Sequence, residues 1–322
     1  MMHETTEIAA DIRDALSRTP RRIPSRYFYD PLGSALFEAI CELPWYHITR
    51  AESRLLTRHR SDLLDRLQPL ATIIELGPGS GEKLKRLLEA APDRRGPIEV
   101  HLVDVSRRAL ESALHTLGAL PVVRIIPHTA DYESGLFEAA ARRTRNGRTL
   151  VLFLGSNIGN FDPPAAADLL AAIRRHLSNG DALLLGTDLV KPEADLLLAY
   201  DDPLGVTAAF NRNLLVRFNR ELGANFDLDA FVHRAIWNAD ESRIEMHLEA
   251  TSTQHVQIPA SGLAFTIGAG ERIWTESSYK YQPAGVARML EAAGFSVSTQ
   301  MIDAEAGFML TLAAVGGQDG TP

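Results

Sequence analysis

A buried strand that runs straight into a glycine-rich turn decides the fold: TIIELGPGSG, residues 72–81. Its first five residues, 72–76, are mostly apolar or β-branched, which predicts a buried strand. Residues 81–91 then carry leucines on one helical face. In open α/β sheets a ligand binds where such a strand ends, and glycines there let it approach the backbone closely. The stretch therefore predicts the binding edge of an α/β sheet.

Strands and helices continue to alternate after this stretch. Further short apolar strands are predicted at residues 99–105, 122–128, 149–154 and 182–189, with helical segments between them. Alternation of this kind implies a parallel sheet wound by right-handed crossovers. The fold class is therefore α/β.

The pattern changes after residue 191. A helix is predicted at 206–222, and the alternating runs 231–237, 243–250 and 253–258 predict an antiparallel meander. The α/β pattern then resumes with a helix and two strands, at residues 283–293, 296–302 and 308–315. The sheet is therefore expected to be interrupted by an insertion large enough to form a small subdomain.

Two domains follow from this interruption. Residues 52–190 and 281–322 are expected to form the cofactor-binding sheet domain. Residues 1–51 and 191–280 are expected to form the second, substrate-binding domain, of α+β type.

The composition describes a globular chain and excludes several classes of function. With 322 residues, of which 45% are hydrophobic and 23% charged, the chain can bury a sizeable core, which excludes disorder as its main state. The formal net charge of -8 argues against nucleic acid as a partner, because phosphate binding needs a basic surface. No apolar run approaches the roughly 18 residues of a membrane helix.

The cysteine and histidine content argues against disulfides and a metal site. Cys41 is the one cysteine, and the ten histidines show no paired H-x-x-x-H spacing. The polar residues 1–14 are unlike a signal or transit peptide. We therefore expect a cytoplasmic monomer that acts on a small molecule, without a metal and away from membranes.

Acidic residues at consecutive strand ends indicate the kind of cofactor. Glu82 stands where a dinucleotide fingerprint has its third glycine, which disfavours a pyrophosphate and favours a positively charged cofactor without phosphate. Asp104 ends the second strand, where a carboxylate can bind both ribose hydroxyls. Asp131 and Tyr132 follow the third strand and suit the edge and face of an adenine. Each alone is more often a turn or cap residue, but together they describe a pocket for S-adenosylmethionine (SAM).

Five further runs make the chain resemble a specific family, the histidine Nα-methyltransferases of ergothioneine biosynthesis. These runs are FLGSNIGNF (153–161), YFYD (27–30), Tyr46 with TR (49–50), YDDP (200–203) and TESS (275–278). The resemblance covers nearly the whole chain, including the insertion. It departs in the glycine turn, with Pro78 and Gly81, and at His47 and Ile48, where the family has a more tyrosine- and proline-like continuation.

The resemblance implies a fold, a reaction and a set of site residues. The implied fold is a Rossmann-like class I methyltransferase sheet with an inserted α+β subdomain. The implied reaction is SAM-dependent trimethylation of the α-amino group of L-histidine to hercynine, the first step of ergothioneine biosynthesis. The implied cofactor contacts are Tyr29, Gly77, Lys83, Asp104, Asp131 and Tyr132. The implied substrate contacts are Tyr46, Asn160, Tyr200, Met246, Glu276 and Ser278, with Tyr46 also catalytic beside the reacting amine.

The chemistry of these side chains suits histidine. A carboxylate at Glu276 and a hydroxyl at Ser278 can satisfy both nitrogens of an imidazole. Apolar side chains would leave the carboxylate unpaired, which is costly. Asn160 and Tyr200 supply neutral donors to the substrate carboxylate. The base that takes the amine proton stays open, with Tyr46 and a water chain as candidates.

Three alternatives compete with this interpretation. Another amino acid, such as tryptophan or tyrosine, is the alternative substrate. A non-catalytic SAM-binding or protein-interaction module is the alternative class. The DPP run at 162–164 could suggest a nucleobase methyltransferase, but Ala165 follows in place of an aromatic residue, and a helix start explains the prolines better. Taken singly, Asn160 suits a turn, and Tyr46 and Tyr200 suit half-buried aromatic positions.

Overall fold

The structure is a computed structural model that describes residues 2–89, 98–120, 123–144 and 146–316. By the contacts within the chain it divides into two compact units. The insertion unit consists of Met1–Tyr46 and Lys191–Ser278, and the sheet unit consists of His47–Val190 and Tyr279–Pro322. Within the described residues, no helix is both long enough and apolar enough to cross a membrane.

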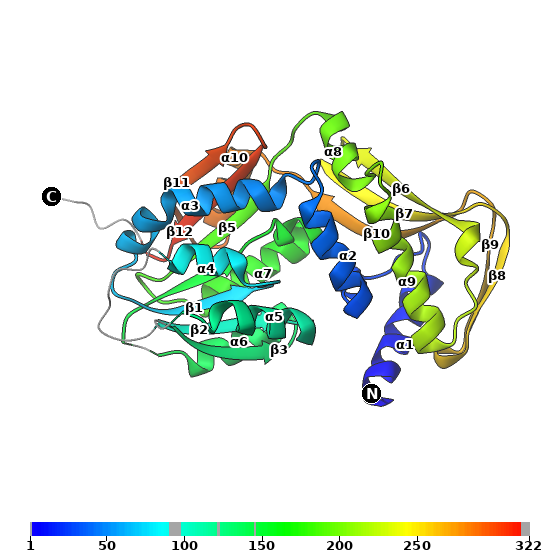
Figure 1. Cartoon of the computed structure of the whole chain (residues 1–322), viewed down its shortest axis with the longest axis horizontal. Helices are drawn as coiled ribbons and strands as arrows, with labels where there is room; N and C mark the ends of the chain where they lie inside the picture. The colour runs from blue at the N-terminus through cyan, green and yellow to red at the C-terminus, as the bar shows by residue number, and fades with distance from the viewer. Residues whose placement is uncertain (1, 90–97, 121–122, 145, 317–322) are drawn as a thin grey trace. The chain divides into compact units, whose positions relative to one another are not determined.

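A seven-stranded sheet, in the order β11-β12-β5-β4-β1-β2-β3, is the framework of the sheet unit (Figure 1). Its strands are β1 (Leu70–Leu76), β2 (Ile98–Asp104), β3 (Val123–Thr129), β4 (Arg148–Phe153), β5 (Ala182–Asp188), β11 (Ser296–Asp303) and β12 (Phe308–Ala314). β12 pairs antiparallel with both of its neighbours, and the other pairs are parallel. The predicted α/β class with a Rossmann-like methyltransferase sheet is confirmed. Val122, the predicted first residue of the third strand, lies outside the described residues.

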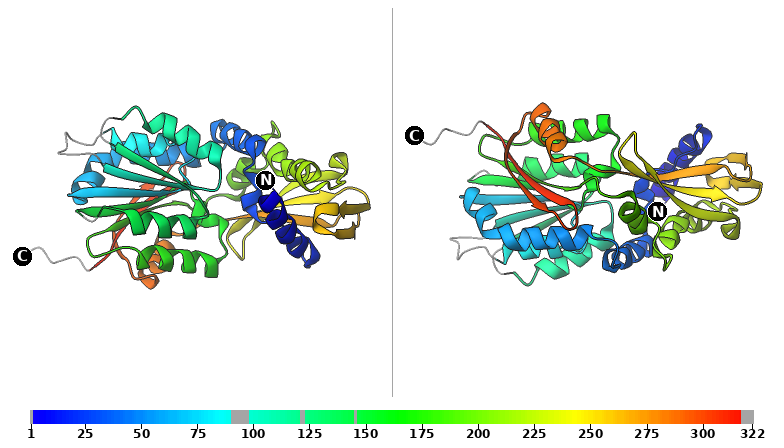
Figure 2. Two further views of the ribbon diagram at one scale, coloured as in Figure 1. Left: turned by 90° about the horizontal axis from the view of Figure 1, so that it is seen from below. Right: turned by 90° about the horizontal axis from the view of Figure 1, so that it is seen from above.

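Helices cover both faces of this sheet (Figure 2). They are α3 (Ile48–Arg66), α4 (Glu82–Leu88), α5 (Arg107–Leu117), α6 (Tyr132–Arg142), α7 (Pro163–Arg175) and α10 (Pro283–Ala292). Helices α6, α7 and α10 share one apolar core with the sheet, in which Phe153 and Leu185 are fully buried. The sheet is therefore buried between two helical layers, which explains why its central strands are almost continuously apolar. Residues 90 and 91, the predicted end of the helix after the glycine turn, lie outside the described residues.

The insertion unit combines helices with a small antiparallel sheet. Its elements are α1 (Met2–Ser17), η1 (Ser25–Phe28), α2 (Pro31–Glu42), α8 (Glu193–Tyr200), α9 (Val206–Leu222), η3 (Leu228–Ala230), β6 (Phe231–Asn238), β7 (Arg243–Ala250), β8 (Gln254–Ile258), η4 (Pro259–Ser261), β9 (Leu263–Ile267) and β10 (Arg272–Tyr279). The strands form one sheet in the order β10-β7-β6 and a separate β8-β9 hairpin.

The predicted meander is therefore wrong in its third run. Residues 253–258 form β8, which pairs with β9, while β10 takes the free edge of β7. The run from Arg272 to Tyr279 mixes polar and aromatic residues, so it gives a weak strand signal even though it pairs with a distant strand.

Asp30 joins two helices of the insertion unit. It caps α2 by accepting from the Gly33 N–H (2.7 Å), and it accepts from Asn213 Nδ2 and Arg220 Nη2 of α9 at 2.7 Å each. Burial alone would raise the pKa of Asp30, but the hydrogen bonds from Arg220, Gly33 and Asn213 outweigh it and the pKa is lowered. The carboxylate is therefore held ionised as the link between α2 and α9.

We predict that Asp30→Ala lowers the free energy of unfolding by about 2–4 kcal/mol, because a helix cap and charge-assisted hydrogen bonds are lost together. Urea denaturation at pH 7 measures this loss. Since the folded-state pKa lies below the unfolded one, the contribution is present above the usual pKa of 3.8 and disappears as the pH falls through the folded value. Asp229→Ala, at a fully exposed aspartate of the same unit, is the control. Equal stability of Asp30→Ala and the parent at pH 7 would contradict the assignment.

Candidate active site

The turn after β1 has the open geometry expected of a cofactor cradle. Gly77 and Gly79 both have left-handed backbones, with φ of 74° and 56°. A Cβ on Gly77 would lie 2.8 Å from Asn157 Nδ2 and 2.9 Å from the Tyr132 hydroxyl, so only glycine fits there. The structure thus brings Gly77 close to Tyr132, another of the predicted cofactor contacts. It adds Asn157, which sequence reasoning did not single out although it lies in the FLGSNIGNF run.

Asp104 and Asp131 lie at the ends they were predicted to occupy. Asp104 ends β2 and accepts from the Ser106 N–H at 2.8 Å. Burial raises the pKa of Asp104 to about 6, although backbone hydrogen bonds from Ser106, Gly79 and Val105 act against the rise. Asp131 caps α6 by accepting from the Ser134 N–H at 2.7 Å. Its carboxylate is exposed and already serves as a helix cap.

Lys83 is paired with a carboxylate that the sequence analysis missed. Its Nζ lies 2.5 Å from Oε2 of Glu52, whose side chain is fully buried in α3. Both oxygens of Glu52 also accept from the Gly155 N–H, at 2.8 and 3.0 Å. A Cβ on Gly186 would lie 2.3 Å from Glu52 Oε1, so β5 makes room for this carboxylate with a glycine. Glu52 therefore connects the predicted cofactor lysine to the end of β4.

Glu75 places a second buried carboxyl group beside the turn. Burial raises the pKa of Glu75 to about 8; nearby Lys83 lowers it, and Glu52 and Asp104 raise it further. Its Oε2 atom is buried and has no hydrogen-bond partner within the described part of the chain. A buried polar atom without a partner is unusual in a folded protein. Glu75 therefore offers a buried carboxyl group that can form a hydrogen bond with a bound molecule.

The loop after β4 carries Asn160 in a tightly packed turn. It begins with Ser156, a non-glycine residue in the left-handed region (φ 58°), whose Oγ accepts from the Asp188 N–H at 2.9 Å. The 3-10 helix η2 (Asn157–Asn160) follows. A Cβ on Gly159 would lie 2.8 Å from the Tyr279 carbonyl, so this turn lies directly against the chain before α10. Strain at Ser156 together with this packing sets the position of Asn160.

Three of the predicted substrate residues meet in the insertion unit. The Tyr200 hydroxyl lies 2.7 Å from Ser278 Oγ, and the rings of Tyr46 and Tyr200 are 6.4 Å apart. Burial, followed by the influence of Tyr200, Cys41, Tyr29 and Glu276, raises the pKa of Tyr46 well above its usual value. Tyr46 therefore keeps its proton at neutral pH. Tyr29 packs edge-on against Phe37, which itself contacts Tyr46.

A buried histidine holds the end of the helix that carries Tyr200. Tyr200 is the last residue of α8, and its carbonyl accepts from His233 Nε2 at 2.8 Å. The other ring nitrogen accepts from Asn211 Nδ2 at 2.8 Å, which fixes the proton on Nε2. Burial lowers the pKa of His233, in keeping with a neutral ring. Neither His233 nor Asn211 was predicted, because neither lies in a recognisable motif.

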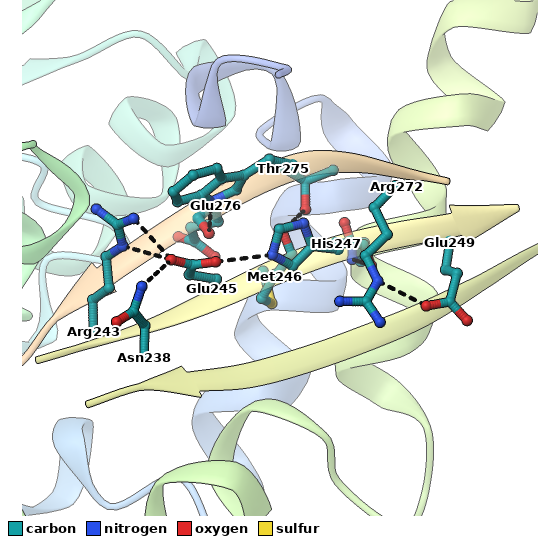
Figure 3. A network of polar contacts seen from close by, with 11 residues as sticks. Asn238, Arg243, Glu245, Met246, His247, Glu249, Arg272, Thr275 and Glu276 are labelled. Carbon is teal, nitrogen blue, oxygen red and sulfur yellow. Dashed lines mark hydrogen bonds and ion pairs between the residues drawn. The ribbon is translucent and has the colours of Figure 1, made fainter. Parts of the chain in front are cut away.

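Met246 and Glu276 lie on β7 and β10, beside a polar network (Figure 3). Met246 is buried, and its carbonyl accepts from Thr275 Oγ1 at 3.0 Å. Its neighbour Glu245 accepts from Asn238 (2.9 Å), Arg243 (2.8 Å) and His247 (3.2 Å). Glu245 and His247 were not among the residues predicted from the sequence, and the network was not foreseen.

The predicted site residues thus fall into two groups. Gly77, Lys83, Asp104, Asp131, Tyr132 and Asn160 belong to the sheet unit, and Tyr29, Tyr46, Tyr200, Met246, Glu276 and Ser278 belong to the insertion unit. In the described ranges, no group of three or more His, Cys, Asp or Glu side chains is placed to hold a metal ion.

Comparison with known proteins gives consistent matches. A family model described as histidine-specific, SAM-dependent methyltransferase matches residues 8–315. The histidine N-alpha-methyltransferase of Mycolicibacterium smegmatis is 43% identical over 94% of this chain and 93% of that protein. Its counterpart in Mycobacterium tuberculosis is 42% identical over 94% of each chain. Ergothioneine biosynthesis protein 1 of Neurospora crassa is 29% identical over 80% of this chain and 31% of that protein.

From the raised pKa of Glu75 we predict how the stability of the protein depends on pH. Because the folded state keeps this proton up to about pH 8 while the unfolded carboxyl loses it near 4.5, stability falls as the pH rises between these values. Glu75→Gln removes this ionisation without changing the shape of the side chain.

We expect the variant to gain about 3 kcal/mol relative to the parent between pH 5.5 and pH 8, as one pKa unit is worth about 1.4 kcal/mol. Urea denaturation of the ligand-free protein measures the difference. Glu82→Gln, at an exposed glutamate of α4, serves as the control. Parallel stability curves for Glu75→Gln and the parent would show the interpretation to be wrong.

Proposed function

Because the chain belongs to the family of histidine-specific, SAM-dependent methyltransferases, we propose that it methylates the α-amino group of L-histidine. Three transfers give hercynine, the first step of ergothioneine biosynthesis, in line with the relative named for that pathway. The observation that carries this proposal is the contact of Tyr200 with Ser278 beside Tyr46, three residues assigned to the substrate. This arrangement favours an enzyme over a non-catalytic SAM-binding module.

We propose that the sheet unit binds the cofactor. The glycine cradle at Gly77, which a Cβ would fill, fits a ligand that approaches the backbone closely, and the unpartnered Oε2 of Glu75 fits a ligand that offers it a hydrogen bond. Asp104 is assigned to the ribose hydroxyls, and Asp131 with Tyr132 to the adenine. Lys83 is assigned to the carboxylate of the methionine part, and Tyr29 is retained as a further cofactor contact. The bound SAM supplies an electrophilic methyl group on its sulfonium.

We propose that the insertion unit selects histidine. Glu276 and Ser278 bind the imidazole, and Met246 lines that pocket with a buried apolar side chain. Tyr200, together with Asn160 of the sheet unit, binds the carboxylate. Neutral donors align the substrate without competing with its ammonium for the anionic side chains.

Tyr46 is assigned to orienting the amine. Its raised pKa keeps the phenol protonated, so its hydroxyl can hold the amine by a hydrogen bond while remaining a poor general base. The water chain is therefore the better of the two candidates for removing the amine proton. Methyl transfer itself depends mostly on holding nitrogen and methyl carbon about 3–3.5 Å apart.

We predict that Glu276→Ala abolishes discrimination between histidine and phenylalanine but leaves binding of S-adenosylhomocysteine unchanged. The reason is that a carboxylate built for an imidazole rejects a side chain that leaves it unpaired. Competition assays with both amino acids and calorimetry with S-adenosylhomocysteine measure the two effects. Glu249→Ala, at another carboxylate of the same sheet, is the matched control. A variant that still prefers histidine as strongly as the parent does would refute the role of Glu276.

A second prediction concerns the product. With excess SAM, we expect mass spectrometry to find three methyl groups on histidine, as the resemblance to the histidine Nα-methyltransferases implies. Tryptophan and tyrosine, tested in the same panel, are the alternative substrates and should react more slowly. Product that stops at one methyl group, or faster turnover of tryptophan, would contradict the proposal. Failure to bind histidine in the presence of S-adenosylhomocysteine would favour the non-catalytic alternative.

We further propose that the protein acts as a monomer in the cytoplasm on this small-molecule substrate. Light scattering during gel filtration should give a mass near 35.3 kDa, and a dimer mass would overturn the monomer proposal.

A further inference from the structure

Trp274 of β10 is tied to the backbone of Glu276, two residues further along the same strand. Its indole Nε1–H donates to the Glu276 carbonyl at 2.8 Å. The backbone of Trp274 is itself fixed, because its N–H donates to the Arg21 carbonyl (2.9 Å) and its carbonyl accepts from the Ile23 N–H (2.8 Å). The indole therefore links the main chain of Glu276 to the backbone of Trp274, which is held by the segment Arg21–Ile23.

This contact replaces a missing strand neighbour. β10 is an edge strand of the β10-β7-β6 sheet, and in the described residues its bridge to the segment before η1 is confined to Arg22 and Trp274. The carbonyls of Trp274 and Glu276 point to the same edge, because backbone groups alternate along a strand. The indole N–H thus donates to a carbonyl that lies beyond the end of this bridge, on the outer edge of the sheet.

The indole itself is held from several sides. The guanidinium carbons of Arg22 and Arg243 lie 4.0 and 4.5 Å from the ring centroid, and the ring of His247 is tilted against it at 5.5 Å. Arg243 is held in turn by Glu245 at 2.8 Å (Figure 3). Only 9% of Trp274 is exposed. Cation–π contacts of this kind stabilise one ring orientation.

We propose that Trp274 is a positioning residue for recognition of the imidazole, acting through the main chain of Glu276. This inference rests on the proposed role of Glu276 as the imidazole ligand. The Glu276 carboxylate can select a ring nitrogen well only if the backbone of Glu276 is fixed. A mobile backbone would let the carboxylate occupy several positions. The Glu276 backbone is held by Trp274. The indole of Trp274 is held in turn by Arg22 and Arg243, and Arg243 by Glu245.

The test is Trp274→Phe, which removes the indole N–H but keeps an aromatic ring between the two guanidinium groups. Loss of one neutral hydrogen bond corresponds to a change of about 2- to 10-fold, so we expect the KM for histidine to rise by this factor. The preference for histidine over phenylalanine should fall by a similar factor. The kcat and the affinity for S-adenosylhomocysteine should stay within about 2-fold of the parent values, since a positioning effect on the substrate leaves the cofactor residues unchanged.

Two further variants keep the test decisive. Trp237→Phe, at a half-buried tryptophan of β6 in the same sheet, is the matched control and should leave the KM and the preference unchanged. Arg22→Met removes one guanidinium from the indole at an exposed position. It should raise the KM by a smaller factor even if Trp274→Phe folds poorly.

The outcomes separate this inference from the proposed function. If Glu276→Ala loses its preference for histidine while Trp274→Phe and Arg22→Met retain the parent KM and preference, Trp274 has no positioning role and the proposed function stands. If Glu276→Ala keeps the full preference, the proposed role of Glu276 fails and the inference about Trp274 fails with it. A raised KM in Trp274→Phe with unchanged kcat supports the inference, because a merely structural role would lower the yield of folded protein and leave the KM unaltered.

Discussion

A single buried charge organises the sheet unit. Glu52 has no exposed surface, and a carboxylate in that position is tolerated only when it is neutralised and hydrogen-bonded. Lys83 supplies the charge, the Gly155 N–H supplies the hydrogen bonds, and the missing side chain of Gly186 supplies the space. These contacts join α3, the first turn of α4 and the exit of β4. One carboxylate therefore holds the glycine turn after β1 and the loop that carries Asn160 in place relative to each other.

In the insertion unit, hydrogen bonds to main-chain carbonyls hold the residues assigned to the substrate in place. Tyr200 and Glu276, both assigned to the substrate, have carbonyls that accept from ring N–H groups, those of His233 and Trp274, at 2.8 Å each. A ring N–H is rigid and directional, so it fixes a backbone without occupying the side chain that must face the ligand. Burial completes the arrangement by keeping Tyr46 protonated. The side chains assigned to binding and the side chains that support them are thus distinct sets.

The sequence predicted what is local and missed what is long-range. The sheet was predicted because its central strands are apolar and end in glycine or aspartate, and the family was predicted from motifs and confirmed by the comparisons. Glu52 was missed, because among the arginines of α3 it looks like a solvated helix residue and its partner Gly155 lies 103 positions away. His233 and Trp274 were missed for the same reason, as their value depends on which carbonyl lies beside the ring. The third run of the meander was wrong, because pairing partners are decided by tertiary contacts.

The insertion unit is built from two segments that are far apart in the chain, and this affects the order in which it can fold during synthesis. Asp30 and its partner Asn213 are 183 positions apart, and the segment between them contains five strands of the sheet unit, β1 to β5. At a synthesis rate of about 5–20 residues per second, the N-terminal helices wait roughly 10–40 s on the ribosome before α9 exists. During that interval α2 lacks its contacts with α9, while strands of the sheet unit can already pair. The contacts between α2 and α9 therefore form late, only after the strands β1 to β5 of the sheet unit have been synthesised.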